Sequence, residues 1–249
     1  MADTGMIINP GREKGDPELP AAGILLINPA EAEAGRRMAR NRKGREAFLF
    51  NSRLMLISAS SAPKNIFFMA GPAVGAPMAV LTMEKLIALG AEKIIIYGWC
   101  GSLTKNLMVG DILLPTWAVS DEGTSAHYPT RRRPESHART RQLLEKGLLS
   151  QGITVQTGPV WTTDAPYRES VSRVKELGEQ GIFGVDMEFA ALAAVASFRK
   201  VKLAAVYLVS DELWSGTWKP GFRTKDFKKK SRNTLNFLAD FCGELALRQ

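Results

Sequence analysis

Cysteine is scarce in this chain of 249 residues, which contains only Cys100 and Cys242. The two lie far apart in the sequence and form no metal-like spacing, so no structural metal site is predicted. So few thiols exclude a disulfide-stapled scaffold and favour reduced cysteines. This composition predicts a cytoplasmic location.

Long hydrophobic runs are also lacking. The longest, from Phe189 to Ala196, falls far short of the roughly 18–20 apolar residues that span a bilayer. The first five residues, Met-Ala-Asp-Thr-Gly, provide neither a basic region nor an apolar segment of the kind found in secretory signals. We therefore expect neither secretion nor a membrane partner.

Charge of one sign is in excess, because 33 lysines and arginines face 25 acidic residues and give a formal net charge of +8. Basic clusters of this kind are typical of solvated faces, and binding of a small anion is the second interpretation. Nucleic-acid binding would need interleaved exposed aromatics or a known module, and neither is visible, so it is not predicted. The clusters lie at residues 36–37, 40–45, 131–133 and 219–232.

Strand patterns alternate with helical patterns along most of the chain, and no repeat or low-complexity linker interrupts them. A hydrophobic content of 45% is enough for a large core. This alternation predicts one three-layer α/β/α domain over residues 21–249, with helices on both faces of a mixed, largely parallel central sheet. Residues 1–20 are rich in glycine, proline and charge without a period, and we expect them to form an extended arm.

Two acidic residues stand where this fold places ligands. Asp211, in the sequence Val209-Ser210-Asp211, ends a near-continuous apolar run that predicts a buried strand. Glu188 opens an alanine-rich helical pattern 23 positions earlier. Ligands of open α/β sheets bind at the carboxyl ends of the strands, where one acid can transfer a proton and another can hold hydroxyl groups. The alternative is that Glu188 only begins a helix and Asp211 only caps one.

Two further strand ends carry residues suited to a flat ligand. The stretch 97–102 contains Gly98 and Gly101, which let the backbone come close to a ligand, although an ordinary tight turn fits equally well. The stretch 160–164 contains Trp161, which could stack on a base or simply fill the core.

Taken together, these segments resemble the nucleoside phosphorylase superfamily, the branch that includes purine nucleoside phosphorylases and uridine phosphorylases. The resemblance covers about two thirds of the chain, in the order and spacing of that family. It implies cleavage of an N-glycosidic bond through an oxocarbenium-like ribose, without any metal or organic cofactor. The matching segments are residues 71–103, 109–128, 158–170, 184–196 and 206–213.

The resemblance also implies roles for particular residues. Glu188 would hold the ribose hydroxyls, with Met187 against the sugar, and Asp211 would protonate or hydrogen-bond a purine ring nitrogen. The substrate would be a purine-type nucleoside, because the pyrimidine-selecting insertion of the uridine branch has no counterpart here. The base site would be lined by Cys100, Gly101, Trp161 and Asp164, with Ser210 beside the acid.

The chain departs from the family where phosphate is bound. Residues 27–31 (from Ile27 to Glu31), Ile96 and Trp99 stand where relatives place a glycine, two arginines and a small hydroxyl residue. Three hypotheses follow: a phosphorylase that uses inorganic phosphate as co-substrate, a nucleoside hydrolase of the same fold, and a nucleoside-binding protein without catalysis. By resemblance, we also expect a homo-oligomer, a dimer or a hexamer, with residues 75–89 and 48–57 as interface candidates.

Overall fold

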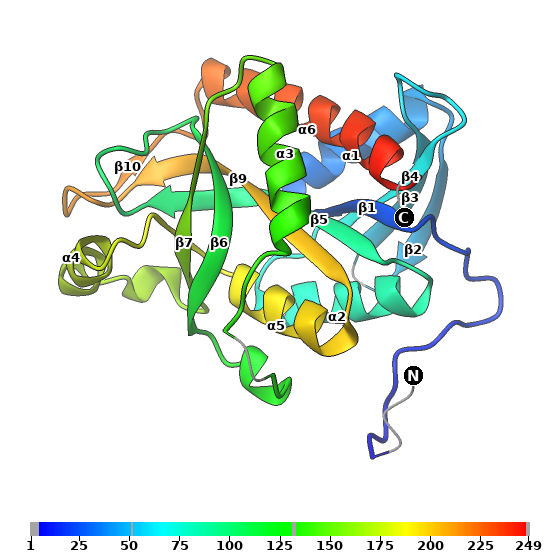
Figure 1. Ribbon diagram of the computed structural model, residues 1–249, viewed down its shortest axis with the longest axis horizontal. Helices are drawn as coiled ribbons and strands as arrows, with labels where there is room; N and C mark the ends of the chain where they lie inside the picture. Colours follow the sequence, from blue (N-terminus) through cyan, green and yellow to red (C-terminus); the bar gives the residue numbers. More distant parts are fainter. Residues whose placement is uncertain (1–4, 51, 131–132, 248–249) are drawn as a thin grey trace.

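The computed structural model describes residues 5–50, 52–130 and 133–247 of the chain. Helices flank a central sheet on both sides (Figure 1), which confirms the predicted α/β/α architecture. None of the described helices is long and apolar enough to cross a membrane.

The sheet is mixed, as predicted, with parallel and antiparallel pairings in equal number among the described strands. Its order is β10-β9-β6-β7-β8-β5-β1-β4-β3-β2. Short antiparallel additions at both ends enlarge a parallel centre made of β4, β1, β5 and β9. The strands are β1 (Ala22–Leu26), β2 (Arg45–Leu49), β3 (Ser52–Ser58), β4 (Ile66–Gly71), β5 (Lys93–Ser102), β6 (Ile112–Asp121), β7 (Val155–Thr163), β8 (Gly184–Asp186), β9 (Lys202–Glu212) and β10 (Lys219–Pro220).

Half of this sheet closes on itself. β9 pairs with both β5 and β6, while β8 pairs with both β5 and β7, so five strands form a ring. β5 runs through the glycines of the 97–102 stretch and ends at Ser102, with an irregular register between Cys100 and Gly101. The stretch is therefore a bulged strand and not the tight turn of the alternative interpretation, and a bulge of this kind re-aims the side chains beside it.

The helices cover the sheet in two layers. Buried residues of α1, α3 and α6 pack on one face, and those of α2 and α5 pack on the other. Figure 1 shows the first group above the sheet and the second group below it. A third cluster lies under α4 at the edge of the ring. The helices are α1 (Pro29–Asn41), α2 (Ala76–Ala88), α3 (Ala138–Ser150), α4 (Val171–Glu179), α5 (Phe189–Arg199) and α6 (Lys225–Leu245).

Residues 5–20 contain neither helix nor strand and run along α2. The ammonium group of Lys85 on α2 donates to the carboxylate of Asp16 (2.7 Å) and to the carbonyl oxygen of Gly11 (2.8 Å). The same ammonium group lowers the pKa of Asp16 below its usual value. The domain boundary itself stays a prediction, and residues 1–4 lie outside the described chain.

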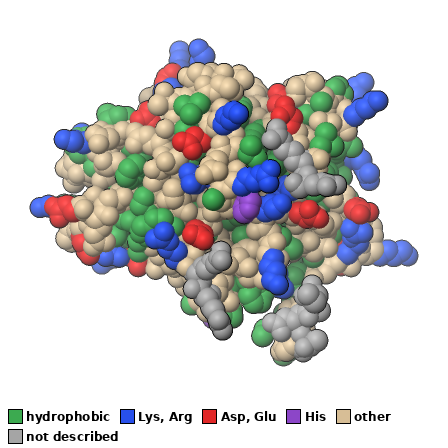
Figure 2. Space-filling model, viewed as in Figure 1, with side chains coloured by type: hydrophobic (Ala, Val, Ile, Leu, Met, Phe, Trp, Pro, Cys, Tyr) green, Lys and Arg blue, Asp and Glu red, His purple; other side chains and the backbone are tan. Residues whose placement is uncertain are grey.

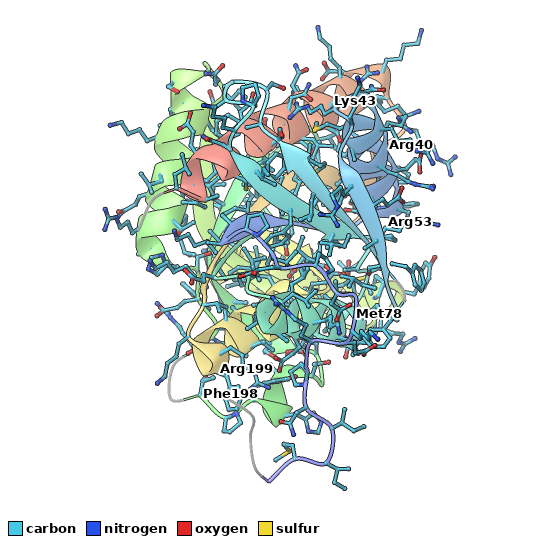
Figure 3. The ribbon with its side chains drawn as sticks, turned by 90° about the vertical axis from the view of Figure 1, so that its right-hand side faces the viewer. Arg40, Lys43, Arg53, Met78, Phe198 and Arg199 are labelled. Atoms are coloured by element: carbon cyan, nitrogen blue, oxygen red, sulfur yellow. The ribbon has the colours of Figure 1, made fainter. Side chains whose placement is uncertain are left out.

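Some basic side chains, inside and outside the basic stretches, lie next to acidic partners. Arg36 and Arg53 both contact the carboxylate of Glu46, at 2.9 and 3.0 Å. Figure 2 shows basic side chains scattered among acidic ones over one face, and Figure 3 shows Arg40, Lys43 and Arg53 on the same side of the molecule. This interspersed pattern is that of a solvated surface. Residues 131 and 132 of the third stretch lie outside the described chain.

Candidate active site

The turn before α5 is organised by a buried carboxylate, that of Asp186. Its Oδ2 accepts hydrogen bonds from the backbone N–H groups of Glu188 (3.0 Å) and Phe189 (2.6 Å) and from the hydroxyl of Tyr207 (2.7 Å). Its Oδ1 accepts one from Thr162 (2.6 Å). Asp186 thus satisfies the first free N–H groups of the helix and fixes the direction in which Glu188 leaves the backbone.

The carboxyl group of Glu188 lies at the junction of two helix starts, and the residue is only 3% exposed. The backbone N–H of Gly75, just before α2, donates to its Oε1 (2.6 Å). Burial and the nearby carboxylate of Asp186 raise the pKa of Glu188 to about 8. Met187 is half-buried beside it. The acid is therefore held in place by a donor from another element and is poised to titrate near neutrality.

Asp211 is half-buried at the end of β9 and has two hydrogen-bond donors. The hydroxyl of Ser210 donates to its Oδ1 (2.5 Å) and the indole N–H of Trp218 to its Oδ2 (2.9 Å). A Cβ placed on Gly101 would lie 3.3 Å from that Oδ2 and 2.4 Å from the Leu213 side chain. A glycine at position 101 therefore allows this close approach of acid and backbone.

The bulge of β5 lies between the two acids. Gly101 pairs with Val185 of β8 on one side and with Asp211 of β9 on the other. Burial raises the pKa of the Cys100 thiol, and the carboxylates of Asp186 and Asp211 raise it further. Cys100, Gly101, Asp186 and Asp211 thus lie together at one rim of the ring, and Glu188 follows Asp186 at the start of α5.

Two more carboxylates face this rim. Asp164 accepts a hydrogen bond from the backbone N–H of Gly123 (3.0 Å), and its charge contributes to the raised pKa of Glu188. Burial, followed by the charge of Asp211, raises the pKa of Glu169 to about 7. Asp164 was among the predicted site residues, whereas Glu169 was not, because it follows an irregular turn that no periodicity marks.

Trp161 lies away from these acids. It is buried in the cluster under α4 with Val174 and Leu177, and its indole N–H donates to Asp121 (2.9 Å). The guanidinium group of Arg173 lies 5.9 Å from the ring centroid. This packing matches the core interpretation of Trp161, and a stacking role stays a prediction.

Glu31 lies in the first turn of α1, which follows β1, and Trp99 lies in β5, three residues before the strand ends. Glu31 is 3% exposed and accepts a hydrogen bond from the hydroxyl of Ser231 (2.7 Å). The Trp99 ring stacks on Phe222 (5.7 Å between centroids) and meets Phe227 edge-on (5.2 Å). The two residues that depart from the family pattern are therefore packed together with side chains of α6 and of the loop before it.

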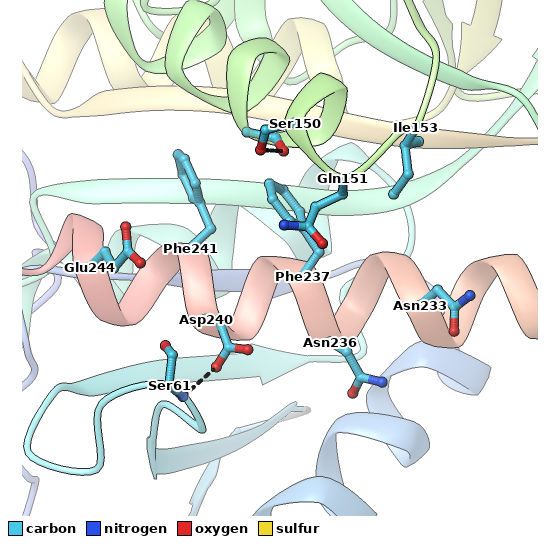
Figure 4. A pocket seen from close by; sticks show the side chains of 11 residues that line it. Ser61, Ser150, Gln151, Ile153, Asn233, Asn236, Phe237, Asp240, Phe241 and Glu244 are labelled. Carbon is cyan, nitrogen blue, oxygen red and sulfur yellow. Dashed lines mark hydrogen bonds between the residues drawn. The ribbon is translucent and has the colours of Figure 1, made fainter.

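A separate hollow of about 640 Å³ lies between α3 and α6, away from Glu188 and Asp211. Figure 4 shows the rings of Phe237 and Phe241 rising from α6 towards α3, with Asp240 accepting a hydrogen bond from the Ser61 backbone. Among the described residues, no group of three histidine, cysteine or acidic side chains is arranged to hold a metal ion.

The sequence profile of the phosphorylase superfamily matches residues 23–243 of the chain. A guanosine phosphorylase from Halorubrum lacusprofundi is 27% identical over 165 residues, which are 65% of this chain and 68% of the relative. A DeoD-type purine nucleoside phosphorylase from Bacillus cytotoxicus is 28% identical over 184 residues, 72% of this chain and 74% of the relative.

The fold is shared with a solved structure of similar length. Purine nucleoside phosphorylase from Toxoplasma gondii, crystallised with immucillin-H, superimposes with a TM-score of 0.81 and covers 98% of both chains. The two sequences are 21% identical, so this likeness speaks for the fold alone.

Proposed function

The chain belongs to the phosphorylase superfamily, and on that premise we propose that it cleaves the N-glycosidic bond of a purine-type nucleoside and releases the free base. The observation that supports the proposal is that Gly101 pairs with Asp211 on one side and with Val185 on the other, three residues before Glu188. The similarity to relatives named guanosine phosphorylase and purine nucleoside phosphorylase supports the substrate class.

In this mechanism, Glu188 binds the sugar. In its ionised form, whose share grows as the pH rises towards 8, the carboxylate accepts hydrogen bonds from the ribose 2′- and 3′-hydroxyl groups while the Gly75 N–H fixes its orientation. As the glycosidic bond lengthens, positive charge develops on the ribose ring, and a carboxylate nearby lowers the energy of that charge. Met187 and Cys100 supply half-buried and buried surface beside the sugar and the base.

Asp211 acts on the leaving base. A purine leaves more readily when a ring nitrogen is protonated or hydrogen-bonded, and an acid at the end of β9 is placed to do so. Ser210 and Trp218 donate to the two oxygens of Asp211 and set its orientation. Phosphate is the acceptor implied by the names of the relatives.

The test incubates the protein with inosine, adenosine, guanosine or uridine, each with and without inorganic phosphate. Chromatography measures the base that is released. We expect base from the purine nucleosides and little from uridine. If no nucleoside is cleaved but one raises the melting temperature of the protein, the chain is a binding protein and the proposal fails.

We also propose that the chain forms a homo-oligomer. Residues in both predicted interface segments expose apolar surface: Phe48 is 67% exposed, and Leu81 on α2 is 48% exposed, near the half-exposed Met78. Leu54, Met55 and Ile57 in the same segments belong to the core. Exposed apolar groups on neighbouring elements are typical of a surface covered by another subunit.

A further inference from the structure

Three buried polar atoms without a hydrogen-bond partner lie near the carboxyl ends of β1 and β5. They are the Oδ1 of Asn28, the Oε2 of Glu31 and the indole Nε1 of Trp99. Buried polar atoms are nearly always paired in folded proteins, so a group of three at one sheet edge calls for an explanation. Two of them are acceptors and one is a donor.

The carboxyl group of Glu31 is buried beside aromatic side chains. Burial raises its pKa, while the hydroxyl of Ser231 and the nearby indole N–H of Trp99 oppose that rise. The indole faces the carboxyl group without reaching hydrogen-bond geometry. Phe222 and Phe227 cover the other faces of the Trp99 ring.

A carboxyl group of the chain itself, that of Glu31, already faces the N-terminus of α1. Helix N-termini attract anions because their free N–H groups point outward. Here Pro29 at the first helical position has no N–H, and the backbone N–H of Glu31 faces its own carboxyl group. The carboxyl group of Glu31 therefore already occupies the position that an external anion would take at this helix start.

This corner is continuous with the two acids of the proposed site. The ring of Trp99 stacks on Phe222, which lies 6.5 Å from the ring of Trp218, the donor to Asp211. From the other side, the carbonyl of Ile27 accepts from the backbone of Ala73, two residues before Gly75. The corner, Asp211 and Glu188 therefore border one region.

Buried carboxyl groups lie in this region, and one exposed guanidinium group, that of Arg223, lies 5.8 Å from the centroid of the Phe222 ring. Burial raises the pKa of Glu31, and burial together with neighbouring carboxylates raises the pKa values of Glu169 and Glu188. Asp186 is also shifted upward by burial. Phosphate binding depends on charge-assisted hydrogen bonds from cations or free N–H groups, and carboxylates facing an anion repel it.

We propose that Glu31 and Trp99 exclude inorganic phosphate from this site and leave water as the acceptor of the ribosyl group, an inference that rests on the proposed function. The C1′–N bond breaks, and its electron pair leaves with the base, which takes one proton from the carboxyl group of Asp211. A water oxygen forms the new C1′–O bond and gives up one proton, which restores that carboxyl group. Nucleoside and water yield base and ribose.

The first experiment follows the products of the purified protein with inosine and guanosine, in buffer without phosphate and with phosphate up to about 50 mM. Base is measured by chromatography, ribose 1-phosphate by phosphorus NMR, and free ribose by a reducing-sugar assay. We expect equal rates in both buffers and free ribose as the product. A rate that depends on phosphate, with ribose 1-phosphate as the product, overturns the inference and leaves the proposed function intact.

The second experiment measures phosphate binding by calorimetry and so does not depend on turnover. We expect no binding by the wild-type protein at millimolar phosphate, and saturable binding overturns the inference. If no base is released from any nucleoside, the proposed function fails, and so does the inference that water accepts the ribosyl group. Calorimetry still decides in that case whether the protein excludes phosphate.

Glu31→Gln keeps the shape of the side chain and removes its charge. We expect it to show saturable phosphate binding at millimolar concentration, where the wild-type protein shows none. The matched control is Glu33→Gln on the same helix, where the side chain is exposed and should leave phosphate binding unchanged. A folded Glu31→Gln protein that matches both wild type and control contradicts the role of Glu31.

Discussion

A carboxyl group that is buried next to another carboxylate favours its protonated form, and Glu188 is in this position. Its pKa of about 8 lies above the value of an unfolded glutamate, so the folded protein binds more protons than the unfolded chain between about pH 4.5 and 8. Stability contributed by the protonated group is therefore fully present below that window and is lost as the pH rises through it.

The variant Glu188→Gln should remove this pH dependence. We expect its melting temperature, relative to that of the wild-type protein, to increase by several degrees between pH 5 and pH 9, since about 1 kcal/mol corresponds to roughly 2–4 °C for a chain of this size. Differential scanning calorimetry measures the difference, and Glu179→Gln on the exposed face of α4 is the control. A constant difference across this range contradicts the raised pKa.

Asp211→Asn tests the acid that acts on the leaving base. Because the amide cannot give a proton to the base, we expect kcat to fall by about 10²-fold or more. Nucleoside binding, measured as thermal stabilisation, should change far less. Asp226→Asn, an exposed acid in the first turn of α6, serves as the control. Equal kcat values for Asp211→Asn and wild type would place the proton transfer elsewhere.

At the scale of single elements, the turn from β8 into α5 depends on Asp186. Asn at this position keeps the size but presents an N–H group to donors, so hydrogen bonds from Thr162, Tyr207 and the helix start are lost or weakened. We expect Asp186→Asn to reduce the free energy of unfolding by about 2–4 kcal/mol and to raise KM through the misplaced Glu188. Urea denaturation and steady-state kinetics measure the two effects.

The cap of α6 provides the matched comparison. The Thr224 hydroxyl accepts a hydrogen bond from the backbone of Phe227 (3.2 Å), and Thr224→Ala should cost about 1 kcal/mol without changing KM. If Asp186→Asn has the same small effect as Thr224→Ala, the carboxylate is not what holds the turn.

The elements themselves were largely visible in the sequence. The apolar runs at 93–97 and 201–209 and the alanine-rich pattern after Glu188 correspond to β5, β9 and α5, because buried parallel strands and buried helices leave continuous apolar signals. β8 has only three residues, too few to show any period. The neighbours of the acids, Gly75 and Trp218, come from distant segments, and only tertiary packing brings them to the site.

At the scale of the whole molecule, the oligomeric state can be tested directly. Exposed apolar side chains on α2 and on the β2–β3 hairpin should lie between subunits. We expect light scattering after size exclusion to give a mass at least twice that of the 27.3 kDa chain, and Leu81→Lys to lower it. Leu149→Lys, an exposed leucine at the end of α3, should not. A monomeric wild-type protein contradicts the proposed oligomer.

The closed ring of β5, β9, β6, β7 and β8 also bears on how the site can change over time. Each strand of the ring has a paired strand on both sides, so a side chain at the end of a strand can be substituted without disrupting an unpaired strand edge. Substitutions that change the chemistry at this end of the ring therefore leave the fold of the sheet in place.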